Sequence, residues 1–573
     1  MRAWRAPALV VIVGLLVAGG VVQHRQDDAA ASRVETTEVE RLMPVAARPG
    51  APSSTWYCAG GTATGKADGV AEHTVTVANA STADVQVSLT AFPSEGEPRS
   101  RSFTVPAGSR RDTALTELVT APWAAALVEV DGGEVGVEHR VRGVDGQAVA
   151  PCASAPAGRW YFPAGATRRG AREVLAVFNP FPDDAVVDLD FETDDGRRTP
   201  QPYQGLVVPG GRVLPVDITD VVTVRNEVAA SVAVRTGRVV VDQVQVWNGT
   251  DGQPRGIGLM LGATAPTATW AFPGGAQLVE SSDVNESYVL YNPGDSPATA
   301  LVQVRTDDEA TRGAVEPYEV TVRPRQYTIV SLTQDRRVPT DVGRWAEVFT
   351  TDGPPLVVER MVQAKGGAPV RGVSQTLGSP LQATRWLVPS AGGAGVSASK
   401  LTVVNPSASD AATVTITAVR DGERGPVEGF DGRSLPAGGR VSLDTDRLPD
   451  PDATLLVVDA SAPVVVATEL ALADPTDRSE AMAIPIAGTT TLLAQPSLVP
   501  PGAIGGTDGG TSPGSSVPLG DLDVGPGSSV PLPNPDATAS STTAPPTTAS
   551  STTAAPAPDG SVTTSTTAAA PSP

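Results

Sequence analysis

The residues of this chain that could take part in catalysis are few, and most of them lie in its first third. There are three histidines, His24, His73 and His139. A hydrolase triad can assemble from distant parts of a sequence, so a serine need not be adjacent to its histidine. However, neither His73 nor His139 recurs in the later segments, and no serine nucleophile motif lies near either of them. We therefore predict no catalytic residues. An exported hydrolase with its site around these two histidines is the second alternative that we keep.

Two aspartate pairs, Asp194-Asp195 and Asp307-Asp308, could indicate calcium binding or a hydrolase with paired carboxylates. Neither fits the twelve-residue calcium loop. Both pairs lie where a hairpin tip is expected, and aspartate favours turn geometry. We therefore predict no metal site and no cofactor.

The chain has two cysteines, Cys58 and Cys152. In an exported protein such a pair is typical of a disulfide, which here would join the two ends of one domain. The chain-entropy estimate for a loop of this length is about 4 kcal/mol of stabilisation. Phe162, Phe272 and Val388 stand where later segments match Cys58, so an apolar side chain and a disulfide look like alternative ways of filling one site.

A polar residue recurs inside an apolar run near the end of four segments. These residues are Glu138, Gln243, Glu359 and Glu469. In a strand with alternating faces such a residue points to solvent, which is the interpretation we prefer. The alternative is a shared contact between domains.

An internal repeat positions all these residues. Trp56, Trp160, Trp270 and Trp386 each open a similar segment, roughly 110 residues apart. A second signature follows about twenty residues later and contains Asn79, Asn179, Asn292 and Asn405. Around it, apolar residues alternate with polar ones, as Val75 and Val77 do, which indicates half-buried strands. Asparagine tolerates tight turns, and the proline that follows it in three repeats cannot donate to a ladder.

The pattern predicts an all-β protein with four tandem antiparallel β-sandwiches of the immunoglobulin-like kind. A propeller of four blades is the rival architecture, but propeller repeats usually have about 40–50 residues. The predicted segments are a signal anchor or transmembrane helix, a linker, repeats one to four and a disordered tail rich in Ser, Thr, Pro and Ala. Their boundaries are 1–24, 25–54, 55–156, 157–266, 267–382, 383–494 and 495–573.

The four repeated tryptophans have two interpretations. A large aromatic residue at the start of a strand usually closes a core. An exposed aromatic could instead stack on sugar rings. Aromatic residues make up 4% of the chain, which is little for four platforms in addition to four cores, so we assign the tryptophans to the core.

The N-terminal residues indicate export. Arg2 and Arg5 precede an uncharged apolar run, which is typical of a signal sequence or signal anchor. We expect an uncleaved single-pass anchor with the rest of the chain outside the cytoplasm, or a secreted protein if the signal is cleaved. The net charge is −21, which argues against nucleic acid as a partner.

The tryptophan openings, the Asn-Pro turns, the N-terminal anchor and the Thr/Ser/Pro tail resemble a family of large exported actinobacterial proteins. That family is classed only as a domain of unknown function, and the similarity covers about residues 50–495. No catalytic residues are established for it, so the resemblance implies none here. We expect a non-enzymatic cell-envelope scaffold or binding protein, whose partner is an envelope polymer or another surface protein. A carbohydrate-binding accessory of envelope glycan assembly is the first alternative.

Overall fold

The computed structural model describes residues 38–66, 70–275, 283–307, 315–333, 337–338, 342–366, 371–392, 396–473 and 476–496. The predicted anchor 1–24 and all but the first two residues of the predicted tail lie outside these ranges. Among the residues described, no helix is long and apolar enough to cross a membrane. The predicted all-β class is confirmed, since antiparallel strands and five short 3-10 helices make up the regular structure of these ranges.

Each of the first two repeats forms two antiparallel sheets of its own. In repeat one the orders are β1-β6-β3-β4 and β5-β2-β7-β8. Their bounds are Ser54–Cys58, Ala124–Val130, Val85–Pro93, Arg99–Val105, Ser109–Ala114, Glu72–Asn79, Val135–Arg142 and Gln147–Pro151. In repeat two the orders are β12-β11-β15-β9, with β13 beside β11, and β14-β10-β16-β17. Their bounds are Gly196–Arg198, Ala185–Thr193, Val228–Thr236, Arg159–Phe162, Leu206–Val208, Arg212–Asp217, Ala171–Asn179, Val240–Asn248 and Arg255–Leu261.

Repeat three again has two sheets, β18-β23-β20-β21 and β22-β19-β24-β25. Their bounds are Thr269–Phe272, Arg344–Asp352, Ala298–Thr306, Tyr318–Val322, Gln326–Ser331, Val284–Asn292, Val357–Ala364 and Gly372–Leu377. Repeat four forms one sheet of ten strands, because the long strand β32, Leu455–Ala473, pairs with both halves. Its other strands are β26 Leu381–Val388, β27 Val396–Val404, β28 Ala412–Arg420, β29 Glu423–Pro426, β30 Arg433–Leu435, β31 Arg440–Asp444, β33 Thr476–Met482, β34 Ile484–Pro485 and β35 Thr490–Leu492.

The 3-10 helices are short and connect strands. Their bounds are Leu115–Glu117, Gln201–Tyr203, Ile218–Asp220, Thr250–Gly252 and Thr445–Arg447.

The strands themselves follow the alternation of apolar and polar residues expected from the sequence. In β3, Val85, Val87 and Leu89 are buried while Gln86 is exposed. One face of β3 is therefore buried along the whole length of the strand.

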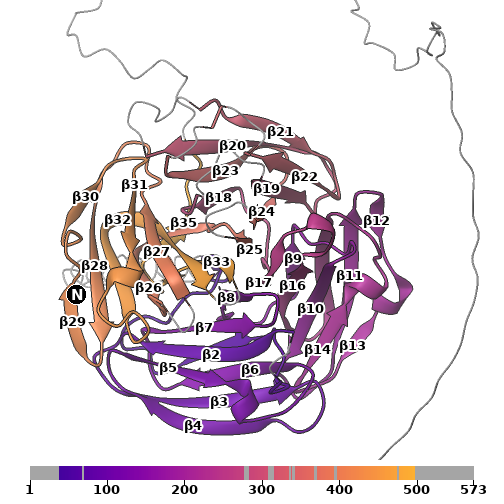
Figure 1. The fold of residues 1–573 in the computed structure, drawn as a ribbon, viewed down its shortest axis with the longest axis horizontal. Helices are drawn as coiled ribbons and strands as arrows, with labels where there is room; N and C mark the ends of the chain where they lie inside the picture. The colour runs from indigo at the N-terminus through magenta and orange to yellow at the C-terminus, as the bar shows by residue number, and fades with distance from the viewer. Residues whose placement is uncertain are drawn as a thin grey trace, which may run out of the picture. The chain divides into compact units, whose positions relative to one another are not determined.

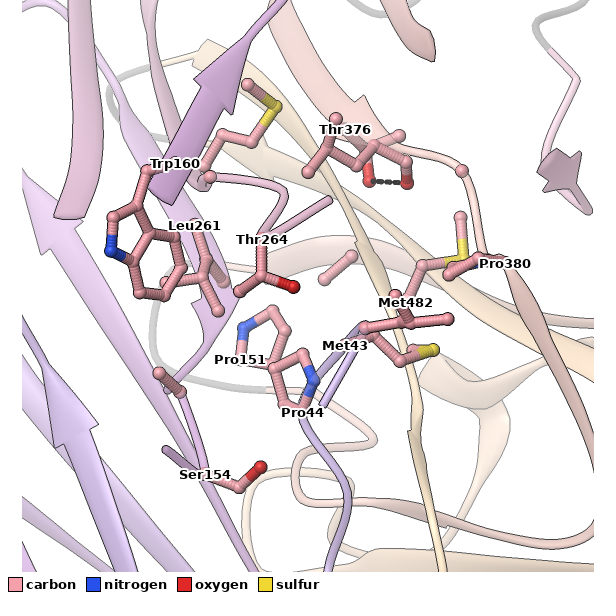
Figure 2. Close-up of a pocket in the computed structure, with 18 of the residues that line it drawn as sticks. Met43, Pro44, Pro151, Ser154, Trp160, Leu261, Thr264, Thr376, Pro380 and Met482 are labelled. Atoms are coloured by element: carbon pink, nitrogen blue, oxygen red, sulfur yellow. Dashed lines mark hydrogen bonds between the residues drawn. The ribbon is translucent and has the colours of Figure 1, made fainter. Parts of the chain in front are cut away.

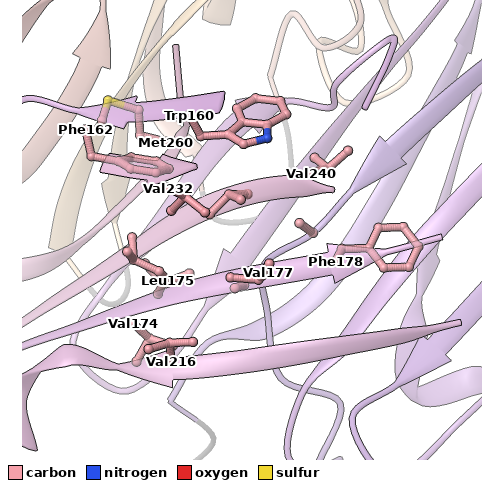
Figure 3. Close-up of a cluster of buried hydrophobic side chains, with 14 of the residues drawn as sticks. Trp160, Phe162, Val174, Leu175, Val177, Phe178, Val216, Val232, Val240 and Met260 are labelled. Atoms are coloured by element: carbon pink, nitrogen blue, oxygen red, sulfur yellow. The ribbon is translucent and has the colours of Figure 1, made fainter. Parts of the chain in front are cut away.

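The folded unit closes into a ring, in which sheets follow one another around a central axis (Figure 1). Each large apolar cluster takes side chains from two neighbouring repeats, and Figure 3 shows part of the cluster centred on repeat two. The ring closes where Leu387, Val457 and Ile484 of repeat four pack with Trp56 and Val75 of repeat one. The repeats are therefore not separate sandwiches, because their outer faces are packed as well.

This closed arrangement resembles the propeller that repeat length argued against. The argument against a propeller was wrong because it compared one whole repeat with one propeller blade. The first three repeats each supply two sheets, so each sheet uses about 50 residues, within the range of propeller blades.

The repeated tryptophans are core residues. Trp56, Trp160, Trp270 and Trp386 are at most 2% exposed. The indole Nε1 of Trp160, Trp270 and Trp386 donates to the carbonyl oxygen of Val239, Leu356 and Val464, respectively. Trp160 and Trp270 thus fill apolar space and also tie their strands to the turn that joins the two sheets of their repeats. Trp386 bonds instead to the long strand β32.

The repeated asparagines are turn clamps with the same bonds in every repeat. Each side-chain amide donates to the carbonyl four or five residues onward and to a carbonyl of the neighbouring strand. Each side-chain oxygen accepts the N–H two residues onward. All four side chains are fully buried. Only an amide provides donors and an acceptor together at this position.

Replacing Asn292 with aspartate should therefore lower the free energy of unfolding by about 3 kcal/mol, because a buried carboxylate would face two carbonyl oxygens. Urea unfolding followed by tryptophan fluorescence measures the change. Asn285→Asp, in the same strand, is the control, since the Asn285 Oδ1 accepts a bond from the Ser331 hydroxyl that aspartate can keep. Equal effects of the two substitutions would contradict the clamp.

Cys58 and Cys152 form the expected disulfide, which joins the end of β1 to the residue after β8. In repeats two and three the counterpart pair is a phenylalanine against a glycine. A Cβ atom on Gly262 would lie 2.6 Å from the ring of Phe162, and one on Gly378 would lie 2.7 Å from the ring of Phe272. The disulfide and the Phe–Gly contact therefore fill equivalent space.

We expect the double variant Cys58→Phe/Cys152→Gly to keep more stability than Cys58→Ala/Cys152→Ala. The alanine pair should lose about 3–4 kcal/mol through loss of the cross-link and of packing. The Phe–Gly pair loses the cross-link but restores the contact that the neighbouring repeats use. Thermal unfolding of both variants under the same buffer tests this, and a Phe–Gly variant less stable than the alanine variant would contradict it.

Part of the predicted linker 25–54 is folded. Residues 40–46, which we call the strap, lie against the ring, and Ala46 forms a parallel bridge with Ile486. Pro44, Val45 and Ala46 are buried. The linker expectation was wrong here because the segment has no periodicity of its own, so the sequence gives no sign of the contacts that order it.

Candidate functional site at the ring axis

Four strands meet at the centre of the ring. They are β8, β17, β25 and β33, one from each repeat, and we call them the axial strands (Figure 1). Each pairs with the strand that carries one of the recurring polar residues. The side chains that could take part in chemistry therefore lie together around the axis.

A single carboxylate joins all four axial strands. The Asp477 side chain accepts the backbone N–H of Gln147, Ile257, Val373 and Arg478, at 3.1, 2.8, 2.9 and 2.8 Å. It is fully buried. The pairing register places Gly146, Gly256 and Gly372 at the position that Asp477 occupies in repeat four. A Cβ atom on any of these glycines would collide with the Asp477 carboxylate.

Three repeats carry a buried polar pair at the same two positions. His73 is 2.9 Å from His139, Gln243 donates to Glu173 at 2.7 Å, and the Arg360 Nε donates to Glu286 at 2.8 Å. One member of each pair, namely His73, Glu173 or Glu286, stands six residues before the repeated asparagine. Burial raises the pKa of Glu173 to about 8. Although Glu286 is also buried, Arg344 and Arg360 lower its pKa to about 2.

A second set of carboxylates clamps the loop that follows the tryptophan strand of the preceding repeat. Asp242 accepts the N–H of Ala59 and of Gly60, at 2.7 and 2.8 Å. Glu359 accepts the N–H of Ala164 at 3.0 Å.

The same strand position in repeat one is Glu138, which hydrogen-bonds to Ser390 of repeat four. This strand position therefore makes a contact at three junctions of the ring, including its closure, while the equivalent residue of repeat four is Ala467. Burial raises the pKa of Glu138 and of Asp242 to about 7, and that of Glu359 well above its usual value.

The solvent interpretation of the recurring polar residues was wrong for Gln243 and Glu359, which are 1% and 0% exposed. Alternating polar and apolar residues imply a solvent-exposed face only when nothing packs against that face of the sheet. These sheets lie between two others. Glu469 is partly exposed. Glu138 also keeps some exposed area as a whole residue, although protein atoms surround its carboxyl group. The contact interpretation holds for Glu138 and Glu359, whereas in repeat two the neighbouring Asp242 makes the contact between repeats.

The two histidines form a buried chain of hydrogen bonds. His73 Nδ1 lies 2.8 Å from the carbonyl oxygen of Ala124, so this nitrogen carries a proton. Its Nε2 then accepts from His139 Nδ1, and the unprotonated His139 Nε2 faces an Asp242 oxygen at 3.5 Å. One further proton placed between His139 and Asp242 would complete the chain.

Burial lowers the pKa of His73 to about 4. In the described ranges neither imidazole has a hydroxyl or thiol as a hydrogen-bond partner. The hydrogen-bond chain through the two histidines therefore joins repeats one and two. Within the described ranges it does not form the triad that the hydrolase alternative needs.

The aspartate pairs lie at turns and form ion pairs. Asp194 and Asp195, between β11 and β12, both pair with Arg225. Asp307 pairs with Arg440 of repeat four at 2.6 Å, and Asp308 is outside the described residues. Within the described ranges, no group of three or more His, Cys, Asp or Glu side chains could hold a metal ion.

One end of the axis opens into a small apolar cavity of about 70 Å³ (Figure 2). Its walls come from axial strands, from segments that join repeats and from the strap. They include Met43, Pro44, Pro151, Trp160, Met260, Trp270, Pro380 and Met482. This volume is far below the roughly 300–1,000 Å³ of ordinary ligand sites. The strap residues Arg41–Pro44 lie at its opening, which we call the axial mouth.

Sequence reasoning missed Asp477 and the clamps Asp242 and Glu359. A signal for Asp477 exists in the repeat alignment, where glycine in three repeats is replaced by aspartate in the fourth. A lone aspartate next to a turn gave no reason to look for it. The clamps were missed because their partners are backbone N–H groups, which leave no trace in side-chain patterns.

Comparisons with known proteins give one family match. Residues 140–333 match a family of unknown function, DUF5719. The match begins within β7 and ends in repeat three, so it is offset from the repeat boundaries and includes all of repeat two. No curated protein matches the chain.

Among solved structures, one similar chain is the tetra-tandem repeat in the extending region of a large adhesion protein. It is 12% identical, the alignment covers 75% of this chain and 99% of that chain, and the TM-score is 0.10.

Proposed function

We propose that this chain is a non-enzymatic extracytoplasmic protein of the cell envelope, which acts as a scaffold or binding surface and is held at the membrane by its N-terminal segment. One observation carries the proposal. The buried side chains that could do chemistry at the axis, such as His139, Asp242 and Glu359, are engaged in joining one repeat to the next. A rigid ring with its polar groups used in this way suits display and binding better than turnover.

The disulfide supports the extracytoplasmic part of the proposal, since such bonds persist in oxidising compartments. The alternatives have less support. A carbohydrate-binding accessory was expected to expose some repeated tryptophans, and all four are buried. An exported hydrolase was expected to use His73 and His139, which lie in the hydrogen-bond chain described above.

Co-sedimentation with purified peptidoglycan sacculi tests the proposal. The detergent-solubilised full chain should pellet with sacculi in a saturable way and should release no soluble fragments, while the heat-unfolded chain is the control. A second assay uses soluble wall polysaccharide in place of sacculi. Release of sugar or peptide fragments would show an enzyme instead, and failure to bind either polymer would remove polymer binding as the function.

A further inference from the structure

Repeats one and four are neighbours in the ring but are not consecutive in the chain, and we call the junction between them the seam. Three covalent segments that join successive repeats, 154–157, 264–267 and 379–382, contribute to the walls of the axial mouth. Ala157 and Thr267, in the first two of these segments, pair with the turn between the two sheets of the repeat that they open. At the junction between repeats four and one, no joining segment exists, and the strap lies in the equivalent position. Ala47, directly after it, accepts the N–H of Glu134 from the corresponding turn of repeat one.

The strap contacts every segment around the mouth. The Thr264 hydroxyl donates to the Arg41 carbonyl oxygen at 2.9 Å, and the Val45 N–H donates to the Ser154 hydroxyl at 3.2 Å. The Ser379 hydroxyl donates to the sulfur of Met43 at 3.3 Å.

Repeat four holds the strap from the other side of the seam. The N–H of Ala46 donates to Pro485, and the Ala46 carbonyl accepts from Ala487. The Glu40 carboxylate accepts the N–H of Gly488 at 2.8 Å.

These contacts are those of a bound peptide. Most of them use main-chain atoms of the strap, while Leu42, Met43 and Pro44 line the apolar cavity. Extended peptides bind in this way, with main-chain hydrogen bonds for affinity and side-chain pockets for specificity. We propose that the axial mouth is a binding site for an extended peptide of the pattern apolar–apolar–Pro–apolar, and that the strap is its occupant within the same chain.

The proposal deepens the proposed binding function, because it names the class of partner that one site of the ring takes. It also gives the ring closure a detachable part. A free segment of the same pattern competes with the strap, and the strap's high local concentration keeps the mouth filled when no competitor is present.

The test separates the strap from the ring without deleting it. A protease recognition sequence inserted between Gly50 and Ala51 lies in an exposed turn, where a Cβ atom on Gly50 would meet no other atom within 4 Å. After cleavage of the full chain, size-exclusion chromatography shows whether the N-terminal fragment stays bound. A fluorescent synthetic peptide of residues 38–50 is then titrated, and its anisotropy reports binding.

The labelled peptide should replace the fragment in a saturable way, and a peptide with Leu42→Asp and Met43→Asp should not bind. Thr264→Val combined with Ser154→Ala in the ring should weaken binding about 10-fold, because two hydrogen bonds are lost. Thr82→Val, at an exposed position, is the matched control and should leave binding unchanged.

Equal binding of the two peptides would overturn the proposal, as would a folded cleaved ring that binds neither. If the cleaved ring unfolds when the fragment leaves, added peptide should restore its near-UV circular dichroism, and failure to do so would also overturn it. No envelope polymer is present in these assays. Their outcome is therefore separate from that of the sacculus experiment.

Discussion

Replacing Asp477 with alanine should lower the free energy of unfolding of the ring by roughly 3–5 kcal/mol, the largest effect that we expect from one substitution. The carboxylate accepts four backbone N–H groups from four axial strands. Each buried donor left without an acceptor costs about 1–3 kcal/mol, and water entering the vacated space recovers part of this. Urea unfolding followed by tryptophan fluorescence measures the loss.

The control is Asp431→Ala, because Asp431 is exposed. A further variant, Asp477→Gly, gives repeat four the glycine that the other three repeats have at this position. It leaves four N–H groups pointing into one space, so formate should stabilise this variant in proportion to its concentration, and chloride at equal ionic strength should do so less. Similar stability of the Asp477 and Asp431 alanine variants would contradict a structural role for this carboxylate.

The strands and turns of this protein could be predicted because their causes are local. Val85, Val87 and Leu89 alternate with polar residues, and the alternation alone indicates a strand with one buried face. Asn292 and its counterparts mark turns for the same reason, since the bonds of each clamp reach mainly residues close in sequence. The core position of the tryptophans also followed from residue type and low aromatic content.

The ring itself could not be predicted, because closure depends on contacts between residues hundreds of positions apart. The strap reaches Pro485, and Asp477 reaches Gln147, without any periodicity that connects them. The burial of Glu359 follows from the same cause. A strand that reads as half exposed is buried on both faces once another repeat packs against it. The candidate site was therefore missed where it lies between repeats.

The free energy of unfolding should fall as the pH rises from 6.5 to 8. Burial raises the pKa of Glu138 and Asp242 to about 7 and that of Glu173 to about 8, so the folded ring holds protons that the unfolded chain has already released. Each such proton lowers the free energy of unfolding by about 1.4 kcal/mol per pH unit until the folded group ionises. His73 and His139 have lowered pKa values. They oppose this trend only below pH 6.5, where the unfolded chain protonates them.

Glu173→Gln separates this cause from a general effect of pH. Glutamine mimics the protonated carboxyl and can still accept the bond from Gln243, so the variant should gain stability over the wild type at pH 8 and show a shallower decline between pH 6.5 and 8. Glu95→Gln, at an exposed position, is the matched control and should keep the wild-type slope. Chemical unfolding at a series of pH values measures both slopes. A stability that rises with pH across this window would mean that the axial carboxylates are ionised in the folded ring, and that their N–H partners outweigh the effect of burial.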